Sequence, residues 1–304
     1  MWIVGVDENG LGPRLGPLVA TAAAIEVKRY DREALEALGA ELRIGDSKQT
    51  SGFGRMRHAE GLALALAERA SGAVPRHADE LLAALSIDGL LALRAPCPDG
   101  ITARQCWQEP LPLPAFGGDV EEGRALLAAL EKGGVKVRRL RTALACAGRI
   151  NEALAAGRSK LQVDLELFER LLLDVRAAAR GDVEAICGMV GGVRKYGRYF
   201  RHFEGAEARE SPKGVCAYAV PAVGAVRFEV KADDRHLPVG LASMVGKVVR
   251  ELGMARLVGF YRGQDPELPV ASGYHDPVTK RFVAGSETLR RSLPIADACF
   301  ERRG

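Results

Sequence analysis

Two adjacent carboxylates follow the first apolar run of the chain, and this limits what the N-terminal segment can form. Residues 2–6 are apolar, Asp7-Glu8 comes directly after them, and a glycine- and proline-rich loop (residues 9–17) leads to a second apolar run, residues 18–27. Short apolar runs on either side of such a loop predict a hairpin. Two ionised carboxylates at a strand end repel each other and need solvent, donors or a cation such as Mg²⁺. An isolated acidic pair is more often a solvated strand end.

The rest of the chain alternates predicted helices and strands. Helical spacing of apolar residues predicts helices over 31–38, 55–70, 79–93, 120–132, 151–179 (one or two helices) and 237–252. Short apolar runs predict strands over 135–144, 182–187, 216–220 and 226–230. Five prolines in residues 95–118 predict a loop or an insertion, and the tail from residue 263 is expected to be loop-rich, with a short helix near 279–286. This alternation of helices and strands predicts one α/β domain.

Composition excludes several classes of protein. The 304 residues are 47% hydrophobic, which excludes disorder as the dominant state, and the net charge of +4 is too small to identify a partner. The six cysteines form no CxxC pair, so neither a disulfide scaffold nor a zinc site is expected. The N-terminus lacks the basic segment of a signal peptide, and no apolar run approaches the ~20 residues that span a bilayer. We expect a cytoplasmic protein with reduced thiols.

The glycine-rich loop does not match a dinucleotide-binding fingerprint. After Gly10 and Gly12, the third glycine is required at position 15, but Leu15 stands there and the next glycine is Gly16. Pro13 lies where the following helix would begin, and no helical pattern follows. The spacing therefore disfavours a nucleotide-binding enzyme of the Rossmann type.

Two further segments carry charged residues near predicted turns. Residues 46–48 (Asp-Ser-Lys) offer a hydroxyl and an ammonium that suit a phosphate, although such tripeptides are usually surface turns. Residues 231–235 lie between a predicted strand and the helix over 237–252, and Asp233 falls near the strand end, where ligand sites of α/β sheets concentrate. Its alternative role is a helix cap.

Two basic segments complete the candidate residues. Ser243, Lys247 and Arg250 form one polar face of the predicted helix, which is either a phosphate-binding surface or a solvated one. Residues 194–201 interleave basic and aromatic side chains, a pattern that suits nucleic acid and equally an exposed amphipathic turn.

In order along the chain, these segments resemble the ribonuclease HII family. The matching stretches are DENGLGP at 7–13, GPLV at 16–19, DSK at 46–48, KADDRHLPVGLASMVGKVVRE at 231–251, SGY at 272–274 and RRS at 290–292. The resemblance implies a ribonuclease H-like mixed sheet flanked by helices in one domain (1–304), with an insertion at about 75–135 and a C-terminal helical appendage at about 254–304.

The resemblance also implies an activity. It is hydrolysis of RNA in RNA–DNA hybrids, or at ribonucleotides embedded in DNA, by a monomeric endonuclease that needs Mg²⁺ or Mn²⁺ and leaves 5′-phosphomonoesters. Asp7, Glu8 and Asp233 match the family's catalytic, metal-binding acids. The expected nucleic-acid contacts are Gly10, Leu11, Gly12, Ser47, Lys48, Ser243, Lys247 and Tyr274. Leu11 replaces an arginine of the family.

One departure affects catalysis. The family's third acid ends a short strand, and the matching residues here are Cys187 and Gly188. Neither is a carboxylate, and Mg²⁺ does not favour a thiolate. Acids considered as substitutes are Asp46, Asp182, Glu184, Glu229 and Asp234. Without a substitute, the chain would be an impaired relative that binds hybrid and does not cleave it.

Overall fold

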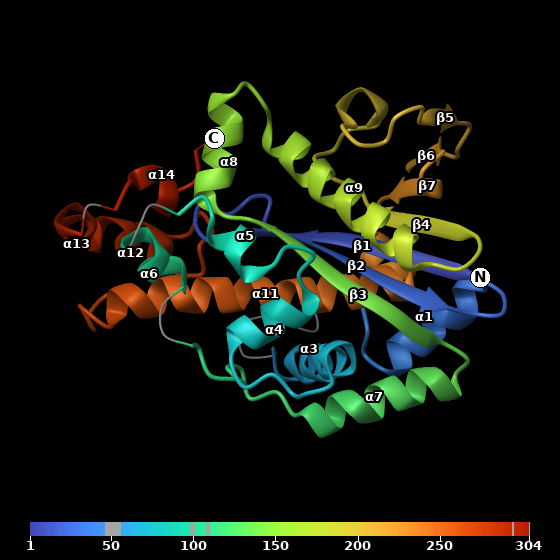
Figure 1. Ribbon diagram of the computed structural model, residues 1–304, viewed down its shortest axis with the longest axis horizontal. Coiled ribbons are helices and arrows are strands. Elements are labelled where there is room, and N and C mark those ends of the chain that lie inside the picture. The colour runs from blue at the N-terminus through green and yellow to red at the C-terminus, as the bar shows by residue number, and fades with distance from the viewer. Residues whose placement is uncertain (46–55, 98–100, 108–109, 294, 304) are drawn as a thin grey trace.

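A seven-stranded mixed sheet forms the centre of the molecule (Figure 1). The computed structural model describes residues 1–45, 56–97, 101–107, 110–293 and 295–303. Its strands are β1 (Trp2–Asn9), β2 (Leu18–Glu26), β3 (Lys136–Ala145), β4 (Val183–Gly188), β5 (Glu207–Arg209), β6 (Val215–Val220) and β7 (Gly224–Glu229). They lie in the order β3-β2-β1-β4-β7-β6-β5. β1 pairs antiparallel with β2, as the predicted hairpin requires, and β1, β4 and β7 are parallel neighbours.

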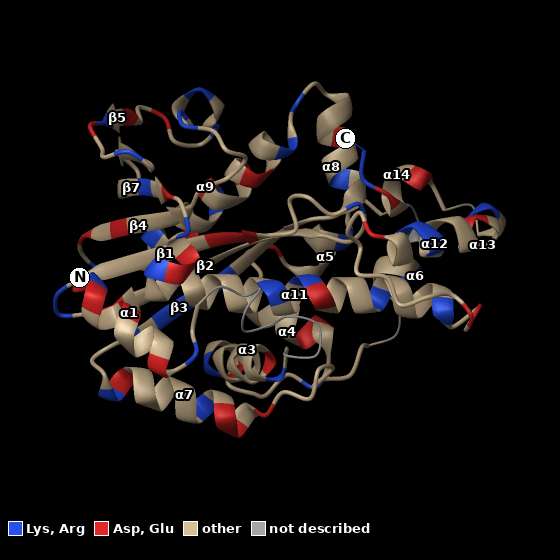
Figure 2. Ribbon diagram, turned by 180° about the vertical axis from the view of Figure 1, so that it is seen from behind, with Lys and Arg blue, Asp and Glu red and all other residues tan. Residues whose placement is uncertain are grey.

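Helices cover both faces of this sheet (Figure 1). One face carries α9 (Lys160–Ala178), with α8 (Ala147–Ala155) beside it. The other carries α11 (Leu237–Arg262), with α1 (Arg32–Glu41), α3 (Met56–Ser71), α4 (Ala78–Leu85) and α7 (Val120–Lys132). Acidic and basic residues alternate along the outer helix α7, whereas the charged residues of α11 are mostly basic (Figure 2). The expected α/β class, a mixed sheet flanked by helices, is confirmed.

The side-chain alternation of β1 determines which helix each of its residues meets. Val4 and Val6 belong to the apolar cluster on the α9 face, whereas Ile3 belongs to the cluster on the α11 face. Gly5 lets α11 approach closely, because a Cβ at this position would lie 2.1 Å from the carbonyl carbon of Pro238. The alternation therefore directs Asp7 toward α11 and Glu8 toward α9.

Several elements differ from the sequence-based expectation. The proline-rich segment contains a helix, α6 (Ile101–Trp107), and the segment over 79–93 divides into α4 and α5 (Leu90–Arg94). The tail is more helical than predicted, with α12 (Pro277–Gly285), α13 (Glu287–Ser292) and α14 (Asp297–Phe300). These short helices form because residues far apart in sequence pack on one another, which local patterns do not reveal.

The basic and aromatic segment 194–201 places one aromatic side chain, Tyr196, in the core and leaves its basic residues exposed. It contains a short 3-10 helix (Gly197–Tyr199). Tyr196 is fully buried, and its ring centroid lies 4.2 Å from that of Phe228. The Tyr196 hydroxyl donates to the Val190 carbonyl oxygen at 2.9 Å. Tyr196 therefore packs on the sheet end and is not available for base stacking, while the basic side chains of the segment remain exposed.

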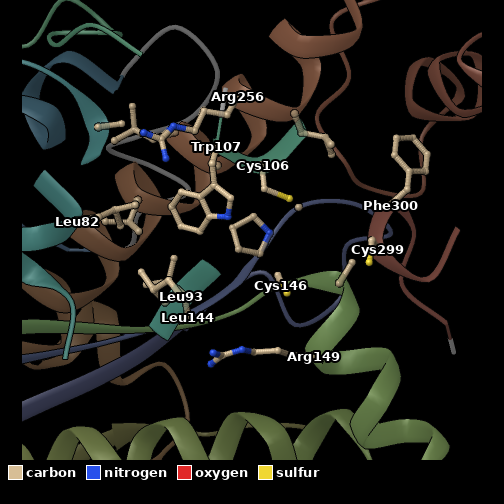
Figure 3. A pocket seen from close by; sticks show the side chains of 18 residues that line it. Leu82, Leu93, Cys106, Trp107, Leu144, Cys146, Arg149, Arg256, Cys299 and Phe300 are labelled. Atoms are coloured by element: carbon tan, nitrogen blue, oxygen red, sulfur yellow. The ribbon is translucent and has the colours of Figure 1, made fainter. Parts of the chain in front are cut away.

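An apolar pocket lies where α6 and α14 meet α11 (Figure 3). Trp107, Cys106, Cys146, Cys299 and Phe300 contribute to its lining. Gln105 joins these elements, because it accepts a hydrogen bond from the Tyr261 hydroxyl at 2.7 Å and donates to the Cys299 carbonyl at 3.1 Å. The pocket is separate from the acidic residues of β1. Among the described residues, no helix is long and apolar enough to cross a membrane.

Candidate active site

The predicted acids come together at the carboxyl ends of the parallel strands. Asp7 and Glu8 lie near the end of β1, Gly188 ends β4, and β7 leads into α10 (Ala232–Arg235), which carries Asp233. Carboxyl ends of neighbouring parallel strands lie on one edge of a sheet, which is where ligand sites of open α/β sheets form.

A cleft of about 330 Å³ lies at this edge. It is lined by residues of β1, the glycine loop, the β4 end, α10, α11 and the loop after α11: Asp7, Glu8, Asn9, Gly10, Leu11, Gly12, Pro13, Gly188, Met189, Lys231, Ala232, Asp233, Ser243, Lys247 and Tyr274. Every predicted site residue that the structure describes is in this set. Ser47, Lys48 and the alternative acid Asp46 lie outside the described residues.

Asp7 is half-buried and lines the cleft. Burial raises the pKa of its carboxyl well above the usual range; the Ser243 hydroxyl, which hydrogen-bonds to it, lowers this pKa, and the charges of Asp233 and Glu8 raise it further. The backbone of Ser243 is also held in place, because Asn9 Nδ2 donates a hydrogen bond to the Ser243 carbonyl oxygen at 3.1 Å. A cation at this point would relieve the repulsion among the acids.

Glu8 anchors the start of the glycine loop. Its Oε2 accepts a hydrogen bond from the Leu11 backbone amide at 3.1 Å. Gly10 has φ +95°, and a Cβ there would lie 2.9 Å from the Pro17 carbonyl oxygen, so the turn requires glycine. Gly12, by contrast, has no atom within 4 Å of its Cβ position. The loop therefore presents an open stretch of backbone to the cleft.

The second wall of the cleft is the Ser272–Gly273–Tyr274 turn, which is bound to the glycine loop. The Gly273 carbonyl accepts from the amides of Arg14 and Leu15 at 2.8 and 3.0 Å. Arg302, which is buried, donates to the carbonyls of Gly10 and Gly16 from the other side. The loop and the turn thus form one rigid wall.

The basic side chains of α11 do not all face the cleft. Arg250 is 0% exposed; it donates to the Ser272 carbonyl at 2.9 Å and lies 4.6 Å from the centroid of the Tyr274 ring. Its expected role at phosphates is therefore wrong, because it supports Tyr274 from beneath. Lys247 lines the cleft and pairs with Glu251 at 2.8 Å. Tyr274 remains 42% exposed.

The strand end expected to carry the third acid has none. Gly188 lines the cleft beside Asp7. Of the substitutes considered, Glu184 and Glu229 both pair with Arg227, and Glu229 also bonds His236 at 2.9 Å. Asp182 precedes the opposite end of β4, and Asp234 is exposed on α10.

Sequence reasoning missed one acid, Asp164 on α9. It is 0% exposed, and neither of its carboxylate oxygens has a hydrogen-bond partner. Burial raises the pKa of this carboxyl well above the usual range, and the charges of Glu8 and Asp7 raise it further. A sequence signal existed: Asp164, Phe168, Leu171 and Val175 follow helical spacing, so an acid occupies an apolar stripe.

The donor set of this region suits a hard divalent cation. Asp7, Glu8 and Asp233 offer carboxylate oxygens, which Mg²⁺ and Mn²⁺ prefer, and Asp164 has two oxygens without partners. In the described ranges, no three His, Cys, Asp or Glu side chains have an arrangement that holds an ion as they stand. Side-chain rotation would have to complete such a site.

No protein-family model and no curated protein matches the chain. Among solved structures, it is similar to ribonuclease HII of Archaeoglobus fulgidus in its complex with PCNA, at 17% identity, a TM-score of 0.50, and coverage of 100% of this chain and 95% of that one. Ribonuclease H2 of Pyrococcus horikoshii OT3 gives 16% identity, a TM-score of 0.45, and coverage of 99% and 92%. Bst-RNase HIII with Mn²⁺ gives 17%, 0.44, and coverage of 95% and 71%. The fold is ribonuclease H-like.

Proposed function

We propose that the chain is a metal-dependent endonuclease of the ribonuclease HII type. It hydrolyses the RNA strand of RNA–DNA hybrids, or DNA at embedded ribonucleotides, and leaves 5′-phosphomonoesters. The observation that carries this proposal is the gathering of Asp7, Glu8 and Asp233 with the glycine loop, Lys247 and Tyr274 around one cleft. We further propose a single domain over 1–304, with the insertion at about 75–135 and the appendage at about 254–304, acting as a cytoplasmic monomer.

Each group of residues has a distinct role in this proposal. Asp7, Glu8 and Asp233 hold Mg²⁺ or Mn²⁺, and divalent ions at such acids activate water and stabilise the leaving oxygen of a phosphodiester. Ser243 positions the Asp7 carboxylate through its hydroxyl. The open backbone at Gly12 allows a ribose to approach, where the 2′-hydroxyl distinguishes RNA from DNA.

The remaining cleft residues suit the backbone and bases of the substrate. The Lys247 ammonium offers a phosphate contact on the α11 side, and Ser47 and Lys48 are proposed to add others. The half-exposed Tyr274 ring offers a surface on which a sugar or base can pack, and Arg250 beneath it keeps the ring in place. Gly10 and Leu11 shape the loop around the reacting ribose.

A second candidate function is hybrid binding without cleavage. Gly188 favours it, because no carboxylate stands at the strand end where the family's third acid is expected. The cleft would then retain substrate contacts and lack a complete metal site.

The test is single-turnover cleavage of a DNA duplex carrying one ribonucleotide, in Mg²⁺ and in Mn²⁺, with binding measured on the same duplex. An all-DNA duplex and Asp7→Asn are the controls. Cleavage at the ribonucleotide, with 5′-phosphate ends and loss in Asp7→Asn, supports the nuclease. Tight hybrid binding without cleavage supports the second function, and equal affinity for both duplexes without cleavage contradicts both.

A further inference from the structure

Asp164 is a buried residue of helix α9, which packs against the sheet at β1, β2 and β3. The charges that act on it are those of Glu8 and Asp7, and its own charge acts on Cys187 at the end of β4. Asp164 is therefore near the ends of both β1 and β4. Glu8 and Cys187 alternate with residues that face α11, which directs them toward the same side as Asp164.

The other buried acids of the described chain all have partners. Glu60 accepts from the backbone amides of Ala115, Phe116 and Gly118 at 2.6 to 2.8 Å. Glu169, on the same helix as Asp164, accepts from the Arg201 amide at 3.0 Å. Glu229 bonds His236 and Arg227. Asp164 alone among these buried acids has two oxygens without a partner, and the charges that raise its pKa are those of two acids, Glu8 and Asp7.

Such a position is unfavourable unless something else compensates. A buried carboxylate without a donor or cation costs stability, and two like charges beside it raise that cost. An apolar residue would continue the stripe of Phe168 and Leu171 at this point. An acid that local packing disfavours therefore needs a role that packing does not supply.

We infer that Asp164 is a further acidic metal ligand beside Asp7, Glu8 and Asp233, and that it supplies from helix α9 the carboxylate that Gly188 leaves missing at the end of β4. No acid stands at the end of the strand, and an acid without hydrogen-bond partners lies on the helix behind it. These two observations are independent, and a metal ligand supplied by α9 in place of β4 explains both. The inference rests on the proposed metal-dependent function. It concerns which residue of this chain supplies the ligand, and it requires that Glu8 and Asp164 share one cation.

The test measures metal binding directly. Purified protein is freed of metal and titrated with Mn²⁺, with free Mn²⁺ followed by electron paramagnetic resonance, and thermal unfolding is recorded with EDTA and with Mn²⁺. Native protein is compared with Asp164→Asn, Asp7→Asn and a matched control, Glu169→Gln. The control removes the charge of another buried acid of α9 that has its own amide partners.

We expect Asp164→Asn to weaken Mn²⁺ binding by about tenfold or more. In EDTA the Tm of Asp164→Asn should exceed that of native protein, because the variant lacks a carboxylate that Glu8 and Asp7 repel. Mn²⁺ should no longer raise the Tm of this variant. Glu169→Gln should lower Tm under both conditions and leave Mn²⁺ affinity unchanged. In the double variant Asp164→Asn/Gly188→Asp, the new strand carboxylate should restore Mn²⁺ binding.

The outcomes separate this inference from the proposed function. If Asp164→Asn binds Mn²⁺ like native protein while Asp7→Asn does not, Asp164 is not a ligand and the metal site itself stands. If native protein and Asp7→Asn both fail to bind Mn²⁺, the proposed metal-dependent function fails and this inference with it.

Discussion

Gly188 lies directly beside Asp7 across the parallel strands β4 and β1: a Cβ at position 188 would stand 2.6 Å from Asp7 Oδ1. The closest atom is the end of a side chain that can rotate, and the Gly188 backbone is not in the left-handed region. An aspartate at this position would thus be tolerated by the backbone and would point its carboxylate toward Asp7.

This relationship gives a test of which acid completes the site. Gly188→Asp in native protein should change the rate of single-turnover cleavage by less than about threefold, because Asp164 already supplies the metal ligand. In the Asp164→Asn background, Gly188→Asp should raise this rate about tenfold or more. Gly188→Asn, equal in size and uncharged, is the control. A large gain from Gly188→Asp in native protein would instead mean that the third position is empty and that the natural chain mainly binds.

Lys247→Ala should weaken hybrid binding and reduce its dependence on salt. One phosphate contact contributes about 0.9 to the slope of log affinity against log salt, so the slope should fall by about one. Fluorescence anisotropy at several salt concentrations measures it. Lys132→Ala, on the exposed end of α7, should leave both quantities unchanged. An unaltered slope for Lys247→Ala would remove α11 from the nucleic-acid surface.

Two glycines of the same loop should respond oppositely to alanine. Gly10→Ala should destabilise the protein by roughly 1–3 kcal/mol, because φ is +95° and the new Cβ meets the Pro17 carbonyl. Gly12→Ala has open space and should leave stability within about 0.5 kcal/mol, yet weaken hybrid binding because the methyl group enters the cleft. Urea unfolding and anisotropy together check the pair. Full hybrid affinity in Gly12→Ala would show that no substrate approaches this backbone.

Acid should destabilise the protein through Glu229. The His236 hydrogen bond, followed by Arg227, lowers the pKa of Glu229 to about 2 from its ordinary 4.5. A lowered pKa in the folded state means stability that is present above about pH 4.5 and lost as pH falls toward 2. Glu229→Gln should therefore weaken the pH dependence of the unfolding free energy in this range. It should also lower the unfolding free energy by about 3 kcal/mol at pH 7. Urea midpoints between pH 2.5 and 7 measure it; an unchanged acid slope would contradict the assignment.

Local patterns were sufficient for the elements that carry their own signal. The apolar runs around the glycine loop gave the β1–β2 hairpin, and the stripe of α11 predicted that helix, although it continues ten residues further, to Arg262. The extension packs on the C-terminal helices, which only tertiary contacts reveal. The same reason explains why α6 forms within a proline-rich segment.

Prediction of the site depended on how the sheet brings distant segments together. Asp7, Glu8 and Asp233 were identified from motif order, and the cleft includes all three. Motif order does not identify Asp164, because the acids whose charges act on it, Glu8 and Asp7, are far away in sequence. Arg250 was placed at the surface because helical spacing gives a polar face, whereas its guanidinium is buried beneath Tyr274.

The clamp that Arg302 forms on the glycine loop has a consequence for biosynthesis. This side chain holds the carbonyls of Gly10 and Gly16, and its backbone amide bonds the Arg14 carbonyl at 3.0 Å. Residues 7 and 8 leave the ribosome long before Arg302, yet the loop beside them is secured in part by this residue, which is synthesised almost 300 positions later. A nascent chain would therefore carry these acids without a finished cleft, and the ability to engage nucleic acid would appear only after residue 302 has emerged and docked.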